Sequence, residues 1–384
     1  MDNPEWPEPV GGSGANLLAS ITHAEDLDGL ASQALLLRWA DRVGRYSEVA
    51  LWRENYLMFP GSFREAARLS ADKAATGRVV DLVVTDLGFN PDVGQAVLEA
   101  AELLKGVAGV RLVYYDHHAS TRAKEAWLRR RGFWCRLGAD DQCATRLVAD
   151  HLLPRDAHAR ELADVASEAD ERLEGGARPD VRALNRTIGL LAGRGDERAR
   201  RLLGKIVDAM REPGYLELDW LATLVSESTA LYEEEVARLP GRVTWREVGV
   251  EGDRPVSVAC TWSDVLSPAD QAEELIALTR GTGRRVDLAL GVAPDGRVVV
   301  FTPAAEGGAA MARGSEENED GSGGSGGAPK AGEIASALGG GGHERRAGYQ
   351  SRAGDGRPAP QVAAAVLDEV TRTIEELELK LKKR

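Results

Sequence analysis

The residues best suited to chemistry are one carboxylate and two adjacent imidazoles, Asp116, His117 and His118, which directly follow an apolar run at residues 110–115. The chain has only 6 histidines and places two of them side by side here. Two other stretches have the same character, and they contribute His23, Asp26 and Asp28 in one loop and Asp86 after a second apolar run.

This combination of side chains predicts a metal site. If the loop that holds Asp26 and Asp28 is extended, both carboxylates lean the same way and repel each other, so a positive charge must lie beside them. Asp and His together suit Mn²⁺ or another borderline divalent ion, and no thiolate is offered. Seven such groups are too many for one ion, so we expect two ions roughly 3.5–4 Å apart that activate water and polarise a phosphoryl group. Asp86, the lone carboxylate on the middle stretch, is the expected bridge.

A simpler interpretation exists for each residue alone. A strand-end Asp such as Asp86 often caps a helix, and a His-His pair is often merely exposed. Three such clusters in one chain favour a site over three coincidences. His151 and His158 lie outside these stretches and are expected to be structural.

The elements that must position these residues alternate along the first part of the chain. Val- and Leu-rich runs predict strands at 17–22, 48–52, 78–85 and 110–115, separated by helical patterns at 29–42, 62–69 and 91–104. Alternation of this kind predicts an α/β fold with a parallel sheet covered on both faces. Ligands of such sheets bind beyond the carboxyl ends of the strands, where the three clusters stand.

The rest of the chain predicts a connector and a second domain. Residues 123 to about 239 lack strand signals and are expected to be helical. Strand signals return at 243–250, 256–261, 286–292 and 298–301, with a helix at 268–280, which indicates a smaller α/β domain. We therefore expect a catalytic domain at 1–195, a helical connector at 196–240 and a substrate-binding domain at 241–384.

Two segments of the second domain have unusual composition. Residues 304–330 are rich in Gly, Ser and acidic side chains and are expected to form a mobile insertion, because they bury too little apolar surface to order themselves. Residues 361–384 predict an amphipathic helix with a basic end, which could dock a replication or repair protein.

The overall charge limits the partners. The formal net charge is −13 and the isoelectric point about 5.1, so broad duplex binding is excluded and nucleic-acid contact must be local. The 3 cysteines lack zinc-ligand spacing and indicate a reduced compartment. The acidic N-terminus does not resemble a signal peptide, and no run of about 18 apolar residues predicts a membrane span, so we expect a cytoplasmic protein.

A glycine-rich stretch, "GGGGHERRAGYQ" at 339–350, predicts an anion pocket. Glycines allow a ligand close to the backbone amides, and the residues that follow supply positive donors. The run could also simply end a helix at 332–338. The expected substrate-binding residues are Gly340, Gly341, Gly342, His343, Arg345, Arg346 and Gly348.

Taken in order, "H-x-x-D-x-D-G", a strand-end Asp, "D-H-H" and "G-G-G-H" resemble the DHH phosphoesterase superfamily with its DHH-associated C-terminal domain. This superfamily includes RecJ-type exonucleases, the nanoRNases NrnA and NrnB, pAp phosphatases and cyclic-dinucleotide phosphodiesterases. The resemblance covers about residues 17–349. It implies two lobes, with two Mn²⁺ ions in the first and substrate held across the cleft by the second; Mg²⁺ or Co²⁺ are alternative ions.

The resemblance also implies a role for each residue. His23 and Asp26 would hold the first ion, Asp28 and His117 the second, and Asp86 would bridge the two ions. Asp116 would orient His117, and His118 would face the scissile phosphate. The family's fourth acidic motif is expected at Asp170, with Asp164 as the rival.

This chain departs from the family pattern at three places. Arg346 replaces a small residue, which indicates an extra phosphate contact or a longer substrate. The arginine often found on the strand before the glycine motif is not evident in "VVVFTP". The spacing from His23 to Asp26 is one residue shorter than in the nanoRNases.

The expected function is metal-dependent hydrolysis of single-stranded or short RNA and DNA oligonucleotides to mononucleotides. The first alternative is a phosphoesterase for pAp or cyclic dinucleotides. The second is a non-catalytic replication scaffold of the same superfamily, which the intact Asp and His ligands make less favourable.

Overall fold

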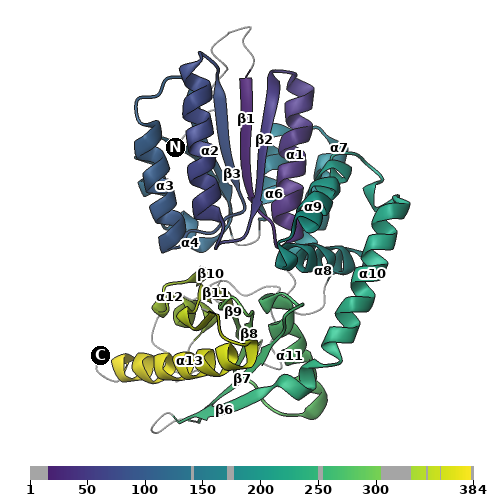
Figure 1. Cartoon of the computed structure of the whole chain (residues 1–384), viewed down its shortest axis with the longest axis vertical. Helices are drawn as coiled ribbons and strands as arrows, with labels where there is room; N and C mark the ends of the chain where they lie inside the picture. Colours follow the sequence, from purple (N-terminus) through teal and green to yellow (C-terminus); the bar gives the residue numbers. More distant parts are fainter. Residues whose placement is uncertain are drawn as a thin grey trace, which may run out of the picture.

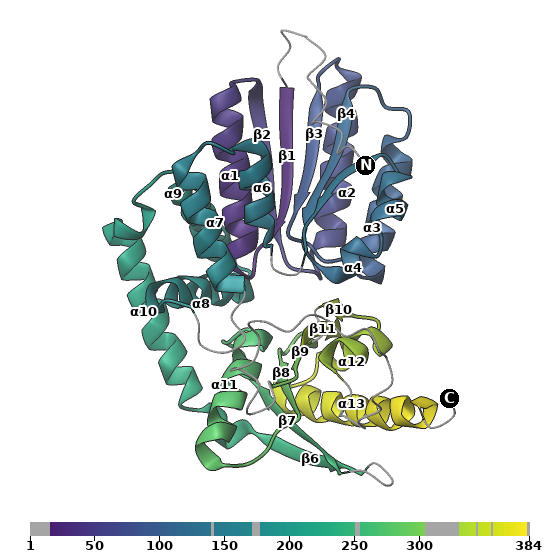
Figure 2. The same ribbon diagram turned by 180° about the vertical axis from the view of Figure 1, so that it is seen from behind.

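The computed structural model describes residues 16–139, 142–170, 177–249, 254–303, 330–342, 345–354 and 356–381. These residues form two lobes, one above the other, joined along one side by the helix α10 (Asp219–Val236) (Figure 1, Figure 2). The expected insertion, apart from residue 330, lies outside the described residues, as do His343 and the basic end at 382–384.

The N-terminal lobe is built on a five-stranded parallel sheet with the order β2-β1-β3-β4-β5. Its strands are β1 (Asn16–His23), β2 (Tyr46–Glu54), β3 (Val80–Thr85), β4 (Val110–Asp116) and β5 (Phe133–Leu137). The chain leaves β1 toward β2 and leaves β3 toward β4, so connections from these two neighbours run in opposite directions. Ligands of open parallel sheets bind at such a point.

Both faces of this sheet are covered, which confirms the expected fold class. Every residue of β1 and β3 is buried, as their continuous apolar runs predict. One face packs against α1 (Leu27–Val43), α6 (Ala144–Leu152) and α7 (Ala157–Asp170). The other packs against α2 (Phe59–Ala75), α3 (Pro91–Leu104) and α5 (Glu125–Arg129).

The expectation of an all-helical stretch from residue 123 to 239 is wrong at β5. This strand pairs with β4 at the edge of the sheet and has only five residues. Its "FWCRL" run lies next to Gly132, whose φ of 86° turns the chain sharply. The run was too short for its strand character to stand out from the helical sequence around it.

The helices after β5 extend the N-terminal lobe further than expected. The helix α8 (Pro179–Arg194) packs with α9 (Glu197–Met210), and α9 also packs on α1 and contributes Leu203, Ile206 and Val207 to the core of the lobe. We therefore propose that the connector begins with α10, after the short η1 turn (Tyr215–Glu217), and not at residue 196.

The C-terminal lobe contains a mixed six-stranded sheet with the order β10-β11-β9-β8-β7-β6. Its strands are β6 (Thr244–Val248), β7 (Val256–Trp262), β8 (Leu288–Val292), β9 (Arg297–Phe301), β10 (Gly341–Gly342) and β11 (Arg346–Gln350). One face packs on α12 (Ala331–Ala337) and α13 (Ala359–Leu381), and the other on α11 (Pro268–Thr282). The strands β10 and β11 were not expected, because the glycine-rich stretch has no strand-like apolar pattern.

Three further observations concern α13, membrane-spanning helices and the cysteines. The apolar stripe of α13, from Val362 to Ile374, is buried against the sheet of its own lobe. In the part of the chain that the structure describes, no helix is both long and apolar enough to span a bilayer. The cysteines Cys135, Cys143 and Cys260 are buried and unpaired with one another.

Candidate metal centre

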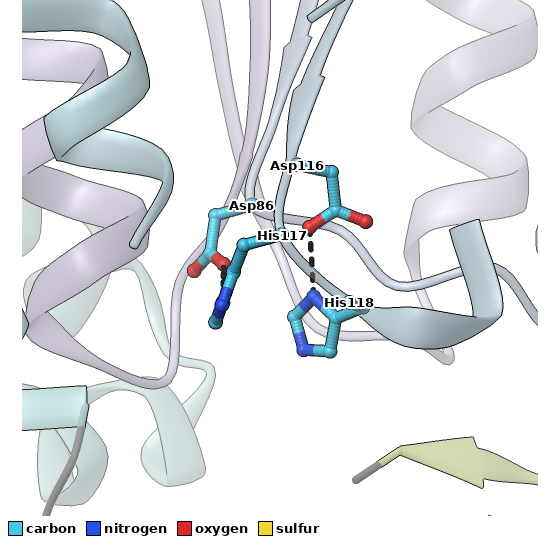
Figure 3. Close-up of side chains that lie close together, drawn as sticks. All are labelled: Asp86, Asp116, His117 and His118. Carbon is cyan, nitrogen blue, oxygen red and sulfur yellow. Dashed lines mark hydrogen bonds and ion pairs between the residues drawn. The ribbon is translucent and has the colours of Figure 1, made fainter. Parts of the chain in front are cut away.

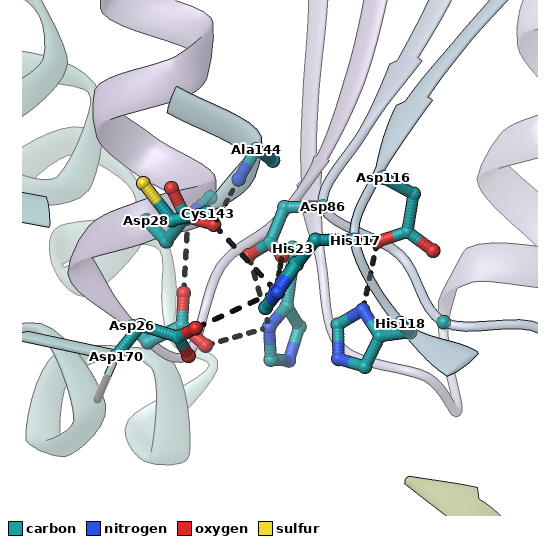
Figure 4. A network of polar contacts seen from close by, with 12 residues as sticks. His23, Asp26, Asp28, Asp86, Asp116, His117, His118, Cys143, Ala144 and Asp170 are labelled. Carbon is teal, nitrogen blue, oxygen red and sulfur yellow. Dashed lines mark hydrogen bonds and ion pairs between the residues drawn. The ribbon is translucent and has the colours of Figure 1, made fainter. Parts of the chain in front are cut away.

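The sheet register brings the expected ligands to one level. Thr22 of β1 pairs with Thr85 of β3, and Thr85 pairs with Tyr115 of β4. The residues that follow these three, His23, Asp86 and Asp116, therefore lie at the same level along the strand direction. Three neighbouring strands thus deliver polar side chains to one point at the carboxyl edge (Figure 3, Figure 4).

The chain enters α1 directly after Asp26, so Asp26 and Asp28 do not lie in one extended loop. The expectation that both carboxylates lean the same way is therefore wrong. Asp26 is the N-cap of α1 and accepts a hydrogen bond from the Gly29 amide at 3.0 Å. Asp28 already belongs to the first turn of the helix. The two side chains therefore diverge: Asp26 contacts His23 Nδ1 at 3.0 Å, while Asp28 turns toward His117 and α6.

Asp28 is held by the start of α6, which the sequence analysis missed. The amides of Ala144 and Thr145 donate to its carboxylate at 2.7 and 2.8 Å, and the Thr145 hydroxyl donates at 2.6 Å. Its Oδ2 lies 3.9 Å from His117 Nε2. A helix N-terminus favours a carboxylate at this position, and the three hydrogen bonds fix its direction.

Asp86 occupies the centre of the site. It is buried and is the one non-glycine residue with positive φ, 52°, among the described residues. Its Oδ1 lies 3.4 Å from His117 Nε2, and its Oδ2 lies 3.9 Å from His23 Nδ1. Asp86 does not cap α3, since Asn90 does. Strain of this kind in a buried polar residue is typical of functional sites.

Two sets of side chains have ligand atoms within 4.8 Å of one another, and Asp86 belongs to both. One set contains His23 and Asp26, and the other contains Asp116, His117 and His118. A carboxylate shared between two ligand sets has the position that a bridging ligand requires.

His117 reaches three carboxylates. Its Nε2 lies 3.6 Å from Asp170 Oδ2, in addition to its contacts with Asp86 and Asp28. Asp164, the rival for the fourth motif, is exposed on α7 and pairs with Arg146. Asp170 therefore lies at the site and Asp164 does not.

The expected orientation of Asp116 behind His117 is not what the structure shows. Asp116 Oδ1 contacts His118 Nδ1 at 2.7 Å instead (Figure 3). The reason is that the chain turns after β4, so that the ring of His118 folds back under the strand end. The second nitrogen of His118 points away from Asp116 (Figure 3).

The site carries an excess of buried negative charge. Burial, followed by the nearby Asp28 and Asp26 carboxylates, raises the pKa of Asp86 well above its ordinary value. Burial lowers the pKa of His117, but the hydrogen bond to Asp86 and the charges of Asp170, Asp86 and Asp28 outweigh burial and raise it to about 11. Without another cation, a proton on His117 is the charge that offsets these carboxylates.

The same side chains fit divalent metal ions. The buried Oδ2 of Asp86 has no hydrogen-bond partner, although a buried oxygen of this kind normally has one. The donors are carboxylate oxygens and imidazole nitrogens, which suit Mn²⁺ and related ions. Burial raises the pKa of the nearby Cys143 well above its ordinary value, so this residue stays a thiol and is a poor ligand.

The glycine-rich stretch forms part of the sheet and is not an open loop. Gly341 and Gly342 pair with Gly348 and Ala347 across β10 and β11. A Cβ atom on Gly340 would lie 2.1 Å from the Gly348 carbonyl oxygen, so only glycine allows this approach. Part of the expected anion-binding backbone is therefore used within the sheet.

The two arginines of this stretch have different surroundings. The Arg345 side chain donates to the Thr302 carbonyl at 3.3 Å. Arg346 makes no hydrogen bond or ion pair with any residue in the described ranges. The carboxylates around it nevertheless raise its pKa against the effect of burial; they are Asp170, Glu273, Asp26 and Asp270, in both lobes. Its guanidinium thus lies among carboxylates of both lobes, with its Cζ 5.9 Å from the centre of the Phe301 ring.

Sequence reasoning also missed two contacts around the site. Glu25, between the ligands His23 and Asp26, forms an ion pair with Arg297 at the start of β9. The strand before the glycine motif thus does carry an arginine, but at its first residue. The ring of Tyr56 lies 5.2 Å from the ring of His23. The sequence signal was the arginine in "GRVVVF", directly before the "VVVFTP" segment in which the arginine of the family was sought.

The chain thus has a parallel-sheet lobe with a D-H-H sequence at the end of its fourth strand, joined by a helix to a mixed-sheet lobe. The structure is similar to a solved DHH-domain protein described as a member of the s1p family of ribosomal proteins, with a TM-score of 0.63 and 14% identity over 94% of this chain and 86% of that one. It is also similar to RecJ from Thermus thermophilus in complex with Mn²⁺, with a TM-score of 0.52 and 14% identity.

The RecJ match covers 94% of this chain and 52% of RecJ, so this chain spans about half the length of that protein. No protein-family model matches the sequence, and no curated protein matches it significantly. The chain has the fold of the DHH superfamily, which confirms the resemblance drawn from the motifs.

Proposed function

We propose that this chain is a metal-dependent phosphodiesterase that hydrolyses single-stranded or short RNA and DNA to mononucleotides. The observation that carries the proposal is the buried carboxylate of Asp86, shared by two sets of Asp and His ligands. The similarity to RecJ, an exonuclease that was crystallised with Mn²⁺, supports it.

The proposed ligands are those that the geometry brings together. His23 and Asp26 would hold one ion, Asp28, His117 and Asp170 would hold the other, and Asp86 would contact both. Two divalent ions at this position, Mn²⁺ or alternatively Mg²⁺ or Co²⁺, would activate a water molecule and stabilise negative charge on a phosphate.

The other residues act on the substrate directly. Asp116 contacts Nδ1 of His118 at 2.7 Å and fixes the direction of the ring, and we propose that the other ring nitrogen hydrogen-bonds a phosphate oxygen or passes a proton to the leaving oxygen. Arg346 would donate to another non-bridging phosphate oxygen from the opposite lobe, because its guanidinium has no ion pair of its own among the described residues.

The charge distribution favours short single strands over duplex. With a formal net charge of −13, the surface as a whole repels a polyanion, so binding energy must come from the cleft. For a protein partner at α13 the structure offers little, since the apolar stripe of that helix is buried and Leu379 is its one large, exposed apolar residue in the described part. We therefore keep nucleic acid as the proposed partner.

The test is a digestion panel with Mn²⁺, Mg²⁺ or Co²⁺ on 5′-labelled RNA and DNA of two to about twenty nucleotides, together with pAp and cyclic dinucleotides. Stepwise shortening of the oligonucleotides is the expected result. Turnover of pAp or cyclic dinucleotides alone would favour the smaller phosphoesterase. Absence of hydrolysis with every metal and substrate would reject catalysis and favour the scaffold.

A further inference from the structure

A cavity of about 720 Å³ is lined by residues of both lobes. Its N-terminal-lobe wall contains Phe89, Ser120 and Lys124, which closely follow Asp86 and His118 in the sequence. The opposite wall contains Lys330 of α12 and Gly340 of the glycine stretch. Figure 1 and Figure 2 show α4 (Ala119–Arg122) facing β10 across the lobes at this place.

Phe89 is a rigid aromatic surface in this wall. Its ring is half-buried and meets the ring of Trp127 edge to face, with centroids 5.3 Å apart. Its amide donates to the hydroxyls of Ser120 and Thr121 at 3.1 and 3.0 Å, so the backbone is fixed to the helix that follows the D-H-H sequence. A ring held in this way can stack a planar group at little entropic cost.

The residue before it connects this surface to the metal centre. A Cβ atom on Gly88 would lie 3.0 Å from Cγ of His118, so the backbone at Gly88 packs directly against the His118 ring. The Gly88 amide also donates to the Tyr56 hydroxyl at 2.9 Å. A group stacked on Phe89 is therefore the immediate neighbour of a phosphate positioned at His118.

The charge of the cavity suits a phosphate chain. Lys124 is exposed and forms no ion pair within the described ranges, and Lys330 lies on the opposite wall. One carboxylate, Glu333, also lines the cavity, and its Oε2 accepts a hydrogen bond from the Lys330 amide at 3.0 Å. Two ammonium groups beside an aromatic face are the elements that single-stranded nucleic acid binding uses.

We propose that this cavity binds the nucleoside next to the scissile phosphate, with its base stacked on Phe89 and its outer phosphate between Lys124 and Lys330. The proposal rests on the phosphodiesterase function proposed above and extends it to a defined subsite. Stacking accepts any base, so the subsite distinguishes the presence of a base from its absence and does not read sequence.

The test compares a trinucleotide with two analogues, each of which lacks one base beside the cleaved bond, on either side of it. Base stacking contributes about 1–3 kcal/mol, so removal of the base on the cavity side should lower kcat/KM by about 5- to 150-fold, and removal on the other side should not. Phe89→Leu should cause a loss of the same size on the intact trinucleotide and no further loss on the sensitive abasic analogue. Phe89→Trp should retain activity, and thermal melting reports whether each variant folds.

Lysine variants provide a second, independent readout. Lys124→Ala should raise KM and weaken the salt dependence of binding, whereas Lys105→Ala, which removes an exposed lysine paired with Glu102 outside the cavity, should change neither. If Phe89→Leu reduces activity equally on intact and abasic substrates, or if neither base matters, the subsite is wrong although the enzyme is active. If the unmodified protein cleaves none of the substrates, the proposed function itself fails.

Discussion

Asp86→Asn separates a bridging carboxylate from a merely buried one. Asparagine matches aspartate in shape and, like aspartate, tolerates the left-handed conformation, whereas alanine at a φ of 52° would add strain of about 1–2 kcal/mol. The substitution therefore removes one charge and leaves the local backbone unchanged.

The size of the effect follows from the distances. Asp86 oxygens lie 3.4 Å from His117 Nε2 and 3.9 Å from His23 Nδ1, so either histidine and Asp86 could hold the same ion. Two unit charges about 4 Å apart interact by about 4 kcal/mol at an effective dielectric constant of 20. A loss of this size corresponds to about a thousandfold lower kcat/KM.

The assay is single-turnover hydrolysis of a 5′-labelled oligonucleotide at saturating Mn²⁺, combined with thermal melting with and without Mn²⁺. The metal-free variant should be at least as stable as the parent, because Asp86 no longer repels Asp26 and Asp28. Its stabilisation by Mn²⁺ should shrink. The matched control is Asp164→Asn, an exposed carboxylate on α7 that should behave like the parent. Asp86→Asn with more than a tenth of parental activity and a full Mn²⁺ shift would refute the bridging role.

Three further predictions concern the surrounding residues. Arg346→Met should raise KM for oligonucleotides about 10- to 150-fold in steady-state kinetics, because a hydrogen bond to a charged group contributes about 1.5–3 kcal/mol; Arg345→Met, the control, should change KM little. The carboxylates raise the pKa of His117 to about 11 in the metal-free protein, so its proton is present at pH 8 and must leave on loading. Calorimetry in HEPES and Tris should therefore show release of about one proton or more per protein; identical uncorrected heats in the two buffers would mean that no proton is released and would contradict this. Thr145→Val should weaken Mn²⁺ binding about 10- to 100-fold in an EPR titration, because the hydroxyl orients Asp28, and Thr145→Ser should restore it.

The sequence was sufficient for the sheet and for the identity of most side chains at the site. The apolar runs of β1, β3 and β4 are largely buried, and each ends in polar residues. Because the carboxyl ends of parallel strands lie at one edge of the sheet, where ligands bind, these polar residues could be expected to meet there. The edge strand β5 escaped notice because five residues carry too little periodicity.

Contacts that depend on long-range packing could not be predicted. Nothing in the sequence near Asp28 indicates that residue 145, more than a hundred positions later, would supply its hydrogen bonds. The partner of Asp116 depends on the turn after β4. The sequence alone does not show whether His117 or His118 turns back to contact Asp116. The glycine run did not indicate strands, because the glycines that pair between β10 and β11 carry no apolar pattern.

The ion pair between Glu25 and Arg297 connects the two lobes at the loop that carries the candidate ligand Asp26. Glu25 stands between the candidate ligands His23 and Asp26, so an opening that breaks this pair would also loosen the segment that positions them. With an ion bound as proposed, thermodynamic reciprocity would require that whatever draws the lobes together also tightens ion binding. Under the proposed function, product release and metal retention would place opposing demands on Arg297, and Arg186, which pairs with Glu274 of the other lobe, would share them.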